Sequence, residues 1–303
     1  MDQSRQVSST ADLAKLHRNQ EPEDQDDVVP KKEKGQLGLS TLHDTQDEAV
    51  IADIIFIHGL GGGSIKTWSD SSGKTTVCWP RDWLPGDPDF QHVRIHTFGY
   101  DADWKDKVPS ILSVHDFAQI LLGEMKNHHQ IGKGSAGIIF VCHSMGGCVA
   151  KKTYILVRED PTCKDLAARV HSMFFLATPH RGSDLGKALR GVLLLNGLSK
   201  PYAEDLVQNS GPVLEVNETF RDIASGLHIW SFFESLPVLG LTRKVVVSKG
   251  SATLGLPNEE VSSMDADHRR VCKFAQRGDH NYRRVRNALV TAIDTIKFEC
   301  FIC

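Results

Sequence analysis

The stretch from residue 138 to residue 147 constrains this chain more than any other part of it. It opens with an apolar run over 138–141 and continues as Cys-His-Ser-Met-Gly-Gly over 142–147. A short apolar, partly β-branched run is typical of a buried strand. The serine that follows has small residues two positions before and after it, as in the G-x-S-x-G pattern, where a parallel strand turns sharply into a helix and strains the serine backbone. We therefore predict a nucleophile elbow that presents Ser144 Oγ at the C-terminal edge of a sheet.

The elbow departs from its pattern at one position. Gly146 fills the downstream small position, but Cys142 stands where the first glycine is expected. Cysteine is small, so the interpretation is kept. The alternative is an ordinary serine in a strand-to-helix turn, because short motifs also match by chance.

Composition excludes several classes of protein. The chain has 303 residues, of which 40% are hydrophobic, and this suffices for a large core. A net charge of -3, with no long Lys/Arg run, gives no electrostatic reason to expect nucleic acid binding. The seven scattered cysteines suit buried thiols in a reducing compartment. No signal-peptide apolar region is present, and no apolar run reaches the roughly 18–20 residues of a membrane span. We expect a cytoplasmic protein.

The chain divides into unequal parts. Residues 1–34 are polar and include an acidic run, so we predict a disordered leader. The alternative is a docking or targeting helix, which a weak helical pattern at 13–16 would favour. Residues 35–299 are predicted to form one domain. Within it, residues 184–226 carry two helical patterns where a simple strand–helix unit needs one, which indicates an inserted helical cap. Its dense leucines, such as Leu189 and Leu193, either fill core or line an apolar substrate channel.

Strand and helix patterns alternate along this domain. Near-continuous β-branched runs such as 49–57 are typical of strands buried on both faces of a parallel sheet. The alternation predicts an α/β fold with one doubly wound, mostly parallel sheet. The expected strands are 37–42, 49–57, 93–100, 138–143, 170–177, 228–233 and 244–248, and the expected helices are 111–128, 145–157, 185–198, 213–224, 269–274 and 282–296.

A serine hydroxyl needs a histidine base to act as a nucleophile, and the base needs a carboxylate to orient it. In the α/β-hydrolase fold the three arrive in the order serine, acid, histidine along the chain. His268 lies on a late loop after the last predicted strand, which makes it the predicted base. His180 and His280 are the alternatives, and His180 fits less well because it precedes every plausible acid.

The predicted orienting acid is Glu234. It directly follows the strand expected at 228–233, so its side chain would reach the same sheet edge as the histidine loop. Asp222 lies in the presumed cap. Asp265 and Asp267 are close to His268 in sequence and would more naturally cap the helix expected to follow.

Two backbone N–H groups are the predicted oxyanion donors, those of Met145, just after the nucleophile, and Leu60, in the glycine run 59–63. The alternative for this run is a phosphate-binding turn. It lacks the P-loop lysine and does not follow G-x-G-x-x-G, so nucleotide binding is disfavoured. The predicted chemistry requires neither a metal nor an organic cofactor.

Several motifs together resemble a known family. They are His-Gly-Leu-Gly-Gly at 58–62, Ile-Lys-Thr-Trp at 65–68, Phe-Gly-Tyr-Asp at 98–101, the elbow at 142–147, Thr-Pro-His-Arg-Gly-Ser at 178–183, Phe-Phe-Glu-Ser at 232–235, Ala-Asp-His-Arg at 266–269 and Cys-Lys-Phe at 272–274. Over about residues 38–298 the chain resembles the lipase-like α/β-hydrolase domain of serine-active-site-containing proteins. This domain also stands at the N-terminus of fungal NACHT-type, NLR-like proteins and is distantly similar to GPI inositol-deacylases. The resemblance implies Ser144, Glu234 and His268 as a catalytic triad.

The last four residues, from Cys300 to Cys303, form a C-a-a-X pattern. Prenylation of Cys300 would tether the protein to a membrane. The alternative is a chance match, because no polybasic stretch precedes it and cysteine is uncommon at the last position. A zinc site at these two cysteines fails for lack of a second pair.

These features predict a serine hydrolase that cleaves a carboxylic ester of an acyl or lipid type through an acyl-Ser144 intermediate. The alternative is a signalling or interaction module that keeps the fold and hydrolyses little. Thioester cleavage and acyl transfer would use the same residues. The sequence leaves the substrate and the oligomeric state open.

Overall fold

The computed structural model describes residues 34–45, 50–101, 113–180, 185–195, 211–240 and 243–302. The chain divides into two units, residues 1–32 and 33–303, and everything described below belongs to the second. All but the last residue of the predicted leader lies outside the described residues. None of the helices among them is long and apolar enough to cross a membrane.

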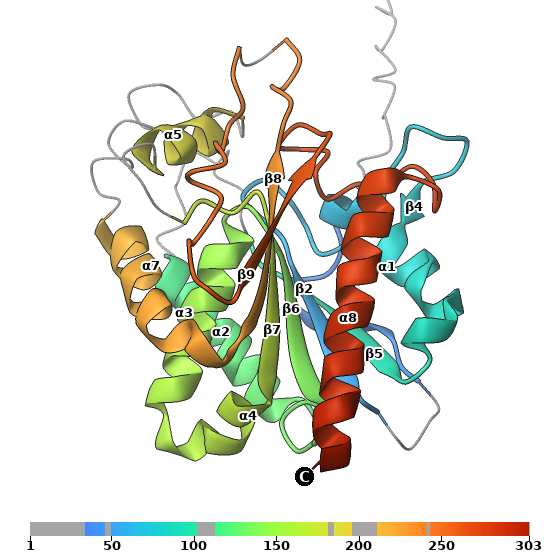
Figure 1. The fold of residues 1–303 in the computed structure, drawn as a ribbon, viewed down its shortest axis with the longest axis vertical. Coiled ribbons are helices and arrows are strands. Elements are labelled where there is room, and N and C mark those ends of the chain that lie inside the picture. Colours follow the sequence, from blue (N-terminus) through green and yellow to red (C-terminus); the bar gives the residue numbers. More distant parts are fainter. Residues whose placement is uncertain are drawn as a thin grey trace, which may run out of the picture. The chain divides into compact units, whose positions relative to one another are not determined.

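A seven-stranded sheet forms the centre of this unit (Figure 1). Its strand order is β1-β5-β2-β6-β7-β8-β9, and every neighbouring pair is parallel except β1 with β5. Crossovers that run first to one side of β2 and then to the other make the sheet doubly wound. This is the predicted α/β-hydrolase fold. The strand bounds are Gly38–His43 (β1), Ala52–Ile57 (β2), Val93–Gly99 (β5), Gly137–His143 (β6), Val170–Leu176 (β7), His228–Glu234 (β8) and Glu259–Met264 (β9).

Helices cover both faces of the sheet (Figure 1). Side chains alternate along β2, so Ile54 and Phe56 pack with α8, whereas Ile55 and Ile57 pack with α2 and α3. The continuous apolar run of β2 follows from burial on both faces. The helix bounds are Trp79–Asp82 (α1), Val114–Asn127 (α2), Gly146–Glu159 (α3), Lys164–Arg169 (α4), Leu185–Leu195 (α5), Gly211–Ile223 (α7) and His280–Ile302 (α8).

The connection between β2 and β5 packs onto the α8 side of the sheet. It contains the short strands β3 (Ser69–Asp70) and β4 (Val77–Cys78), helix α1 and three short 3₁₀ helices, at Lys66–Trp68, Leu84–Gly86 and Pro88–Phe90. Trp68 and Trp79 are fully buried and meet Phe56 edge-on, with ring centroids 5.0 and 5.2 Å from it. Edge-to-face aromatic pairs stabilise such contacts beyond the area they bury.

The strand predicted at 244–248 is wrong. These residues form bends, and the last strand is β9, within what the sequence predicts as a long loop. Val246 and Val247 are apolar because they are buried under α5, and the Val247 N–H donates to the Glu234 side chain instead of to a strand ladder. β9 lacks the apolar run by which the buried strands are predicted, because it is an edge strand, where polar residues such as Glu259 and Glu260 are expected.

The helix predicted at 269–274 is also wrong, because the residues after His268 form turns. The carboxylate of Asp267 accepts from the N–H groups of Arg269 and Arg270, at 2.8 and 3.0 Å. This capping arrangement holds the turn without continuing into a helix. The predicted helix 111–128 begins only at Val114 among the described residues, after a capping box formed by Ser113 and Asp116.

The segment predicted as a cap, 184–226, contains α5 and α7, and residues 196–210 lie outside the described part of the chain. α7 packs on the body, where Phe220 meets Tyr154 of α3 edge-on at 6.1 Å. α5 packs instead with the start of α3 and the 246–252 loop. The two helices therefore cover different parts of the domain.

The turn into α3 requires glycine. A Cβ on Gly146 would lie 2.4 Å from the carbonyl oxygens of both Ile57 and His58, which are backbone atoms that cannot rotate away. We expect Gly146→Ala to destabilise the fold by about 2 kcal/mol or more through overpacking. Gly123→Ala in α2 is the matched control, because a Cβ there meets nothing within 4 Å. It should stabilise the fold by about 0.5–1 kcal/mol. Urea unfolding measures both, and equal effects would contradict the close packing at the elbow.

Candidate active site

Ser144 stands at the sharp turn between β6 and α3. Its φ angle is 52°, in the left-handed region that costs free energy for any residue other than glycine. Its N–H donates to the Leu176 carbonyl of β7 at 2.9 Å, which helps to hold the strained conformation. The strain that the sequence pattern predicts at this serine is present.

Cys142 is accommodated at the position that the pattern reserves for glycine. Its side chain is fully buried in the apolar cluster between the sheet and α2 and α3, together with Ile57 and Val149. Burial raises the pKa of the Cys142 thiol, so the thiol stays protonated. The residue therefore packs as a small apolar side chain and offers no thiolate to compete with Ser144.

Three predicted side chains meet at the C-terminal edge of the sheet. His268 Nε2 lies 2.9 Å from Ser144 Oγ, and His268 Nδ1 lies 3.1 Å from Glu234 Oε2. Ser144 follows β6, Glu234 is the last residue of β8, and His268 lies on the loop after β9. The exposed fractions are 1% for Ser144, 2% for Glu234 and 4% for His268. A hydroxyl, an imidazole and a carboxylate are thus joined in one buried hydrogen-bonded chain.

The protonation of this chain follows from its partners. A carboxylate at Glu234 can only accept hydrogen bonds, so the proton of the neutral His268 ring lies on Nδ1, and this N–H donates a hydrogen bond to Glu234. Nε2 then carries the lone pair that faces the Ser144 hydroxyl, which is the tautomer a general base requires. The second carboxylate oxygen of Glu234 accepts from the Val247 N–H, so both oxygens are held.

His143 holds the histidine loop in place. Its Nε2 donates to the backbone carbonyl of His268 at 2.8 Å. Burial and the neighbouring His268 lower the pKa of His143 to about 3, so it donates as a neutral imidazole. Sequence reasoning missed this role, and the only signal for it was the position of His143 next to the nucleophile.

The glycine loop after β2 lies against the nucleophile. A Cβ on Gly59 would lie 2.8 Å from the Ser144 Cβ, and the Gly62 N–H closes a turn onto the Gly59 carbonyl at 3.1 Å. The two predicted oxyanion donors therefore come from segments that touch Ser144, Leu60 from this turn and Met145 from the start of α3. Neither N–H has an acceptor within the described segments.

His58 fixes this loop, and sequence reasoning assigned it no role. Its Nδ1 lies 2.8 Å from the Gly59 carbonyl, and its Nε2 accepts from the Tyr100 N–H at 3.2 Å. The Tyr100 hydroxyl donates to the His58 carbonyl at 2.7 Å, and the two rings stack with centroids 4.2 Å apart. Burial lowers the pKa of His58 to about 4. A neutral imidazole therefore positions the backbone that leads into Leu60.

The alternative residues lie elsewhere. His180 is buried, with its Nδ1 2.9 Å from Nζ of Lys151. His280 begins α8 and pairs with Asp265 at 2.9 Å near the surface. Asp267 caps its own turn and Asp222 is exposed on α7. Among the described residues, no hydrogen bond joins any of these five side chains to Ser144, whose hydroxyl lies against His268 instead.

Helix α3, which begins at the elbow, contains a buried lysine, Lys151. Nζ of Lys151 bonds to Asn217 of α7 as well as to His180, and it lies 5.6 Å from the centre of the Phe175 ring. Burial lowers the pKa of Lys151. The lysine thus links α3, α7 and the segment after β7. In the sequence it is one of two adjacent lysines in a helix that also contains Arg158 and Glu159, and nothing in that pattern indicated these partners.

Helix α5 covers the elbow with apolar side chains. Ala188, Leu189 and Val192 pack with Met145 and Cys148 in one buried cluster. Arg269, next to the predicted base, donates to the Leu195 carbonyl at the end of α5. Apolar side chains of α5 therefore lie over the residue that follows Ser144.

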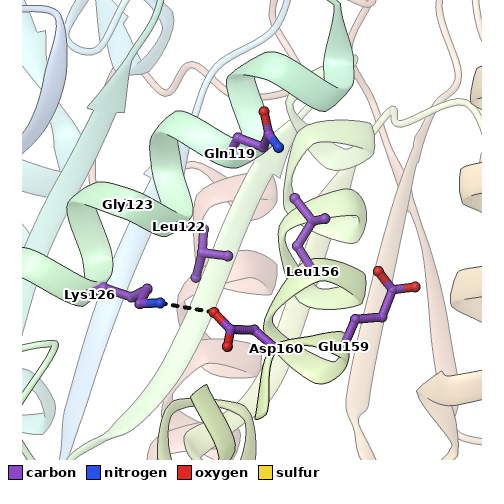
Figure 2. A pocket seen from close by; sticks show the side chains of 7 residues that line it. All are labelled: Gln119, Leu122, Gly123, Lys126, Leu156, Glu159 and Asp160. Carbon is purple, nitrogen blue, oxygen red and sulfur yellow. Dashed lines mark hydrogen bonds and ion pairs between the residues drawn. The ribbon is translucent and has the colours of Figure 1, made fainter. Parts of the chain in front are cut away.

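A separate groove lies between α2 and α3 (Figure 2). Its volume is about 450 Å³, and Lys126 and Asp160 form an ion pair across it at 2.9 Å. Neither Ser144 nor His268 lines it, so it is not a binding site for a substrate of Ser144. The lining residues are Gln119, Leu122, Gly123, Lys126, Leu156, Glu159 and Asp160.

Known proteins of similar sequence share one name. No family model matches the chain. Protein SERAC1 of Danio rerio is 29% identical over 287 residues, which cover 86% of this chain and 42% of that protein. Protein SERAC1 of Homo sapiens is 26% identical over 291 residues, covering 87% of this chain and 43% of that protein. The chain spans less than half the length of these relatives. The match agrees with the resemblance to serine-active-site-containing proteins, whereas the likeness to fungal NACHT-type proteins and GPI inositol-deacylases stays a prediction.

Solved structures of low identity share the general architecture. The type II thioesterase YbtT of the yersiniabactin pathway superposes with a TM-score of 0.48 at 15% identity, over 85% of this chain and 98% of that chain. A lipase-esterase related protein from Clostridium acetobutylicum gives a TM-score of 0.46 at 12% identity, over 84% of this chain and 98% of that chain. Similarity at this level carries no argument about the site.

The neutral state of His58 makes the fold sensitive to acid. The unfolded chain binds a proton at His58 near pH 6.5, whereas the folded chain binds it only near pH 4. The unfolded state then holds more protons, so the free energy of unfolding falls as the pH drops through this window. At pH 5 the loss due to His58 is about 2 kcal/mol. Urea unfolding at several pH values should give a flatter pH dependence for His58→Gln than for the wild type. Equal slopes would mean that folding does not lower the pKa of His58.

Proposed function

We propose that this chain is a serine hydrolase of the esterase or lipase type. The observation that carries the proposal is the buried hydrogen-bonded chain from Ser144 Oγ through the His268 ring to the Glu234 carboxylate. Nucleophile, base and orienting acid in contact are the arrangement that activates a serine hydroxyl. Ser144, His268 and Glu234 are then a catalytic triad.

The reaction begins when Ser144 Oγ attacks the carbonyl carbon of an ester. His268 Nε2 takes the hydroxyl proton, and Glu234 stabilises the imidazolium that forms. The carbonyl oxygen becomes an oxyanion that accepts hydrogen bonds from the N–H groups of Leu60 and Met145. When the carbon–oxygen bond to the leaving group breaks, His268 returns the proton to the leaving alkoxide. The alcohol departs and an acyl-Ser144 remains.

Deacylation uses the same groups, with water as the nucleophile and Ser144 Oγ as the leaving group. Water attacks the acyl carbon while His268 Nε2 takes one of its protons, and the oxyanion again forms beside Leu60 and Met145. Collapse of this intermediate breaks the bond to Ser144 Oγ, and His268 returns the proton to the serine. The carboxylic acid leaves, and each step uses only residues of this chain.

The substrate is a small-molecule ester with an apolar acyl or lipid portion. The apolar cover that Ala188, Leu189 and Val192 of α5 form over Met145 supports this choice, because a polar acyl group would lose its hydration there without gaining partners. α5 then acts as a cap over the site. The cap must move for a substrate to reach Ser144, which is 1% exposed.

Labelling with a fluorophosphonate probe tests the nucleophile. The probe phosphonylates an activated serine, so it should label the wild-type chain at Ser144 and should not label Ser144→Ala. Cys142 provides an internal control, because its protonated, buried thiol should stay unmodified. An unlabelled wild type, in a folded sample beside a labelled control hydrolase, would overturn the enzyme proposal and favour the interaction module.

Turnover of p-nitrophenyl esters tests the roles of the partners. We expect Ser144→Ala and His268→Ala each to lose about a millionfold in kcat, and Glu234→Gln to lose less, about ten-thousandfold. Longer acyl chains should be cleaved with higher kcat/KM. Activity retained in Glu234→Ala would transfer the orienting role to another acid.

The departure at Cys142 has its own test. Because the cysteine packs in an apolar cluster and has no polar role, Cys142→Gly should keep the kcat of the wild type or raise it. The same ester assay measures this, with circular dichroism to show that the variant is folded. A large loss of turnover in a folded variant would contradict the proposed elbow geometry.

A further inference from the structure

Three side chains with metal-binding atoms gather at the end of the sheet opposite Ser144. His228 is the first residue of β8, His171 lies next to the start of β7, and Glu299 lies near the end of α8. In Figure 1 this end of α8 carries the C-terminal label, away from α5. The proposed hydrolase chemistry uses none of the three.

Their distances suit a single cation. One ligand atom from each residue lies within 4.8 Å of the ligand atoms of the other two. His171 Nε2 and Glu299 Oε2 are 3.5 Å apart, and the two imidazole rings lie 4.7 Å apart between centroids. Tetrahedral zinc with bonds of about 2.0–2.1 Å holds its ligand atoms roughly 3.3 Å apart. The two rings are stacked, with an interplanar angle of 17°, so the exposed His228 ring must turn for both nitrogen lone pairs to point at one cation.

His171 is held ready to act as a ligand. Its Nδ1 lies 2.6 Å from the Ser172 hydroxyl, which can accept from it and leave the lone pair on Nε2. That Nε2 is buried and forms no hydrogen bond within the described residues. Metal-binding histidines are oriented in this way, with one ring nitrogen on a polar partner and the other on the metal.

The other two ligands are free to adjust. His228 and Glu299 are exposed, so a ring rotation or a change of carboxylate rotamer costs little. β7 and β8 are adjacent parallel strands in which Ser172 pairs with His228, and the His171 and His228 rings stack beside this pair. The exposed side of the cluster can admit water as a further ligand. Two imidazole nitrogens and one carboxylate oxygen favour zinc or a similar transition metal over calcium or magnesium.

We propose that His171, His228 and Glu299 form a binding site for a divalent transition-metal cation of the zinc type. Bound metal joins the final turns of α8 to β7 and β8. It therefore stabilises the C-terminal helix on the sheet, at a distance from the triad.

The test uses the untagged chain of 303 residues, freed of metal with a chelator and titrated with Zn²⁺ in a calorimeter. We expect one Zn²⁺ per chain at this site and a rise in Tm with zinc, because a ligand that binds only the folded state stabilises it. His228→Ala and Glu299→Gln should each weaken Zn²⁺ binding by at least about tenfold, and Ser172→Ala should weaken it by about tenfold through its partner His171. His115→Ala, an exposed histidine on α2, is the matched control and should bind as the wild type does.

Co²⁺ separates this site from the cysteines, because thiolate ligands add a near-ultraviolet charge-transfer band that imidazole and carboxylate ligands lack. We expect Co²⁺ to bind without this band. His228→Ala and Glu299→Gln change exposed side chains, so the test does not depend on the folding of a variant at the half-buried His171. No saturable Zn²⁺ binding by the wild type, unchanged binding by both His228→Ala and Glu299→Gln, or a thiolate band would each overturn the proposal.

Discussion

The site depends on how closely the start of α3 approaches the end of β2. With no side chain at Gly146, the helix turn lies against the Ile57 and His58 carbonyls, where a Cβ would come within 2.4 Å. This approach brings the glycine loop after β2 against Ser144 and places Leu60 and Met145 on neighbouring segments. The left-handed backbone at Ser144 is retained because the surrounding sheet and helix over-determine it. Strain in one residue is thus offset by packing across the whole sheet edge.

Two neutral imidazoles hold the loops at this edge of the sheet in position. His58 holds the glycine loop and His143 holds the loop that carries His268, each with a pKa lowered by burial. A charged ring at either position would lose hydration without a carboxylate to compensate it. Acid therefore destabilises the folded state partly through the groups that position the proposed machinery, so stability and site geometry are linked through the same two residues.

The sequence predicted the features that topology fixes and missed those that depend on tertiary contacts. Ser144, Glu234 and His268 each follow a strand, and parallel strands end at a common edge, so chain order sufficed to bring them together. β9 was missed because an edge strand need not be apolar, and 244–248 was misassigned because its valines are buried by α5 rather than by a sheet. The role of His58 and the cluster around His171 depend on neighbours distant in sequence, which no local pattern reveals.

The bond from the Val247 N–H to Glu234 has a consequence for how this chain can vary. The donor belongs to the backbone, so replacing the side chain at 247 by any residue other than proline leaves the donor in place. Oε1 of Glu234, the oxygen that does not face His268, therefore keeps its hydrogen bond when other side chains of the 243–250 loop are replaced. Substitutions in this loop can alter the apolar surface facing α5 without removing the hydrogen bond to the Glu234 side chain. The architecture thus separates the apolar surface under α5 from the hydrogen-bonded carboxyl group behind it.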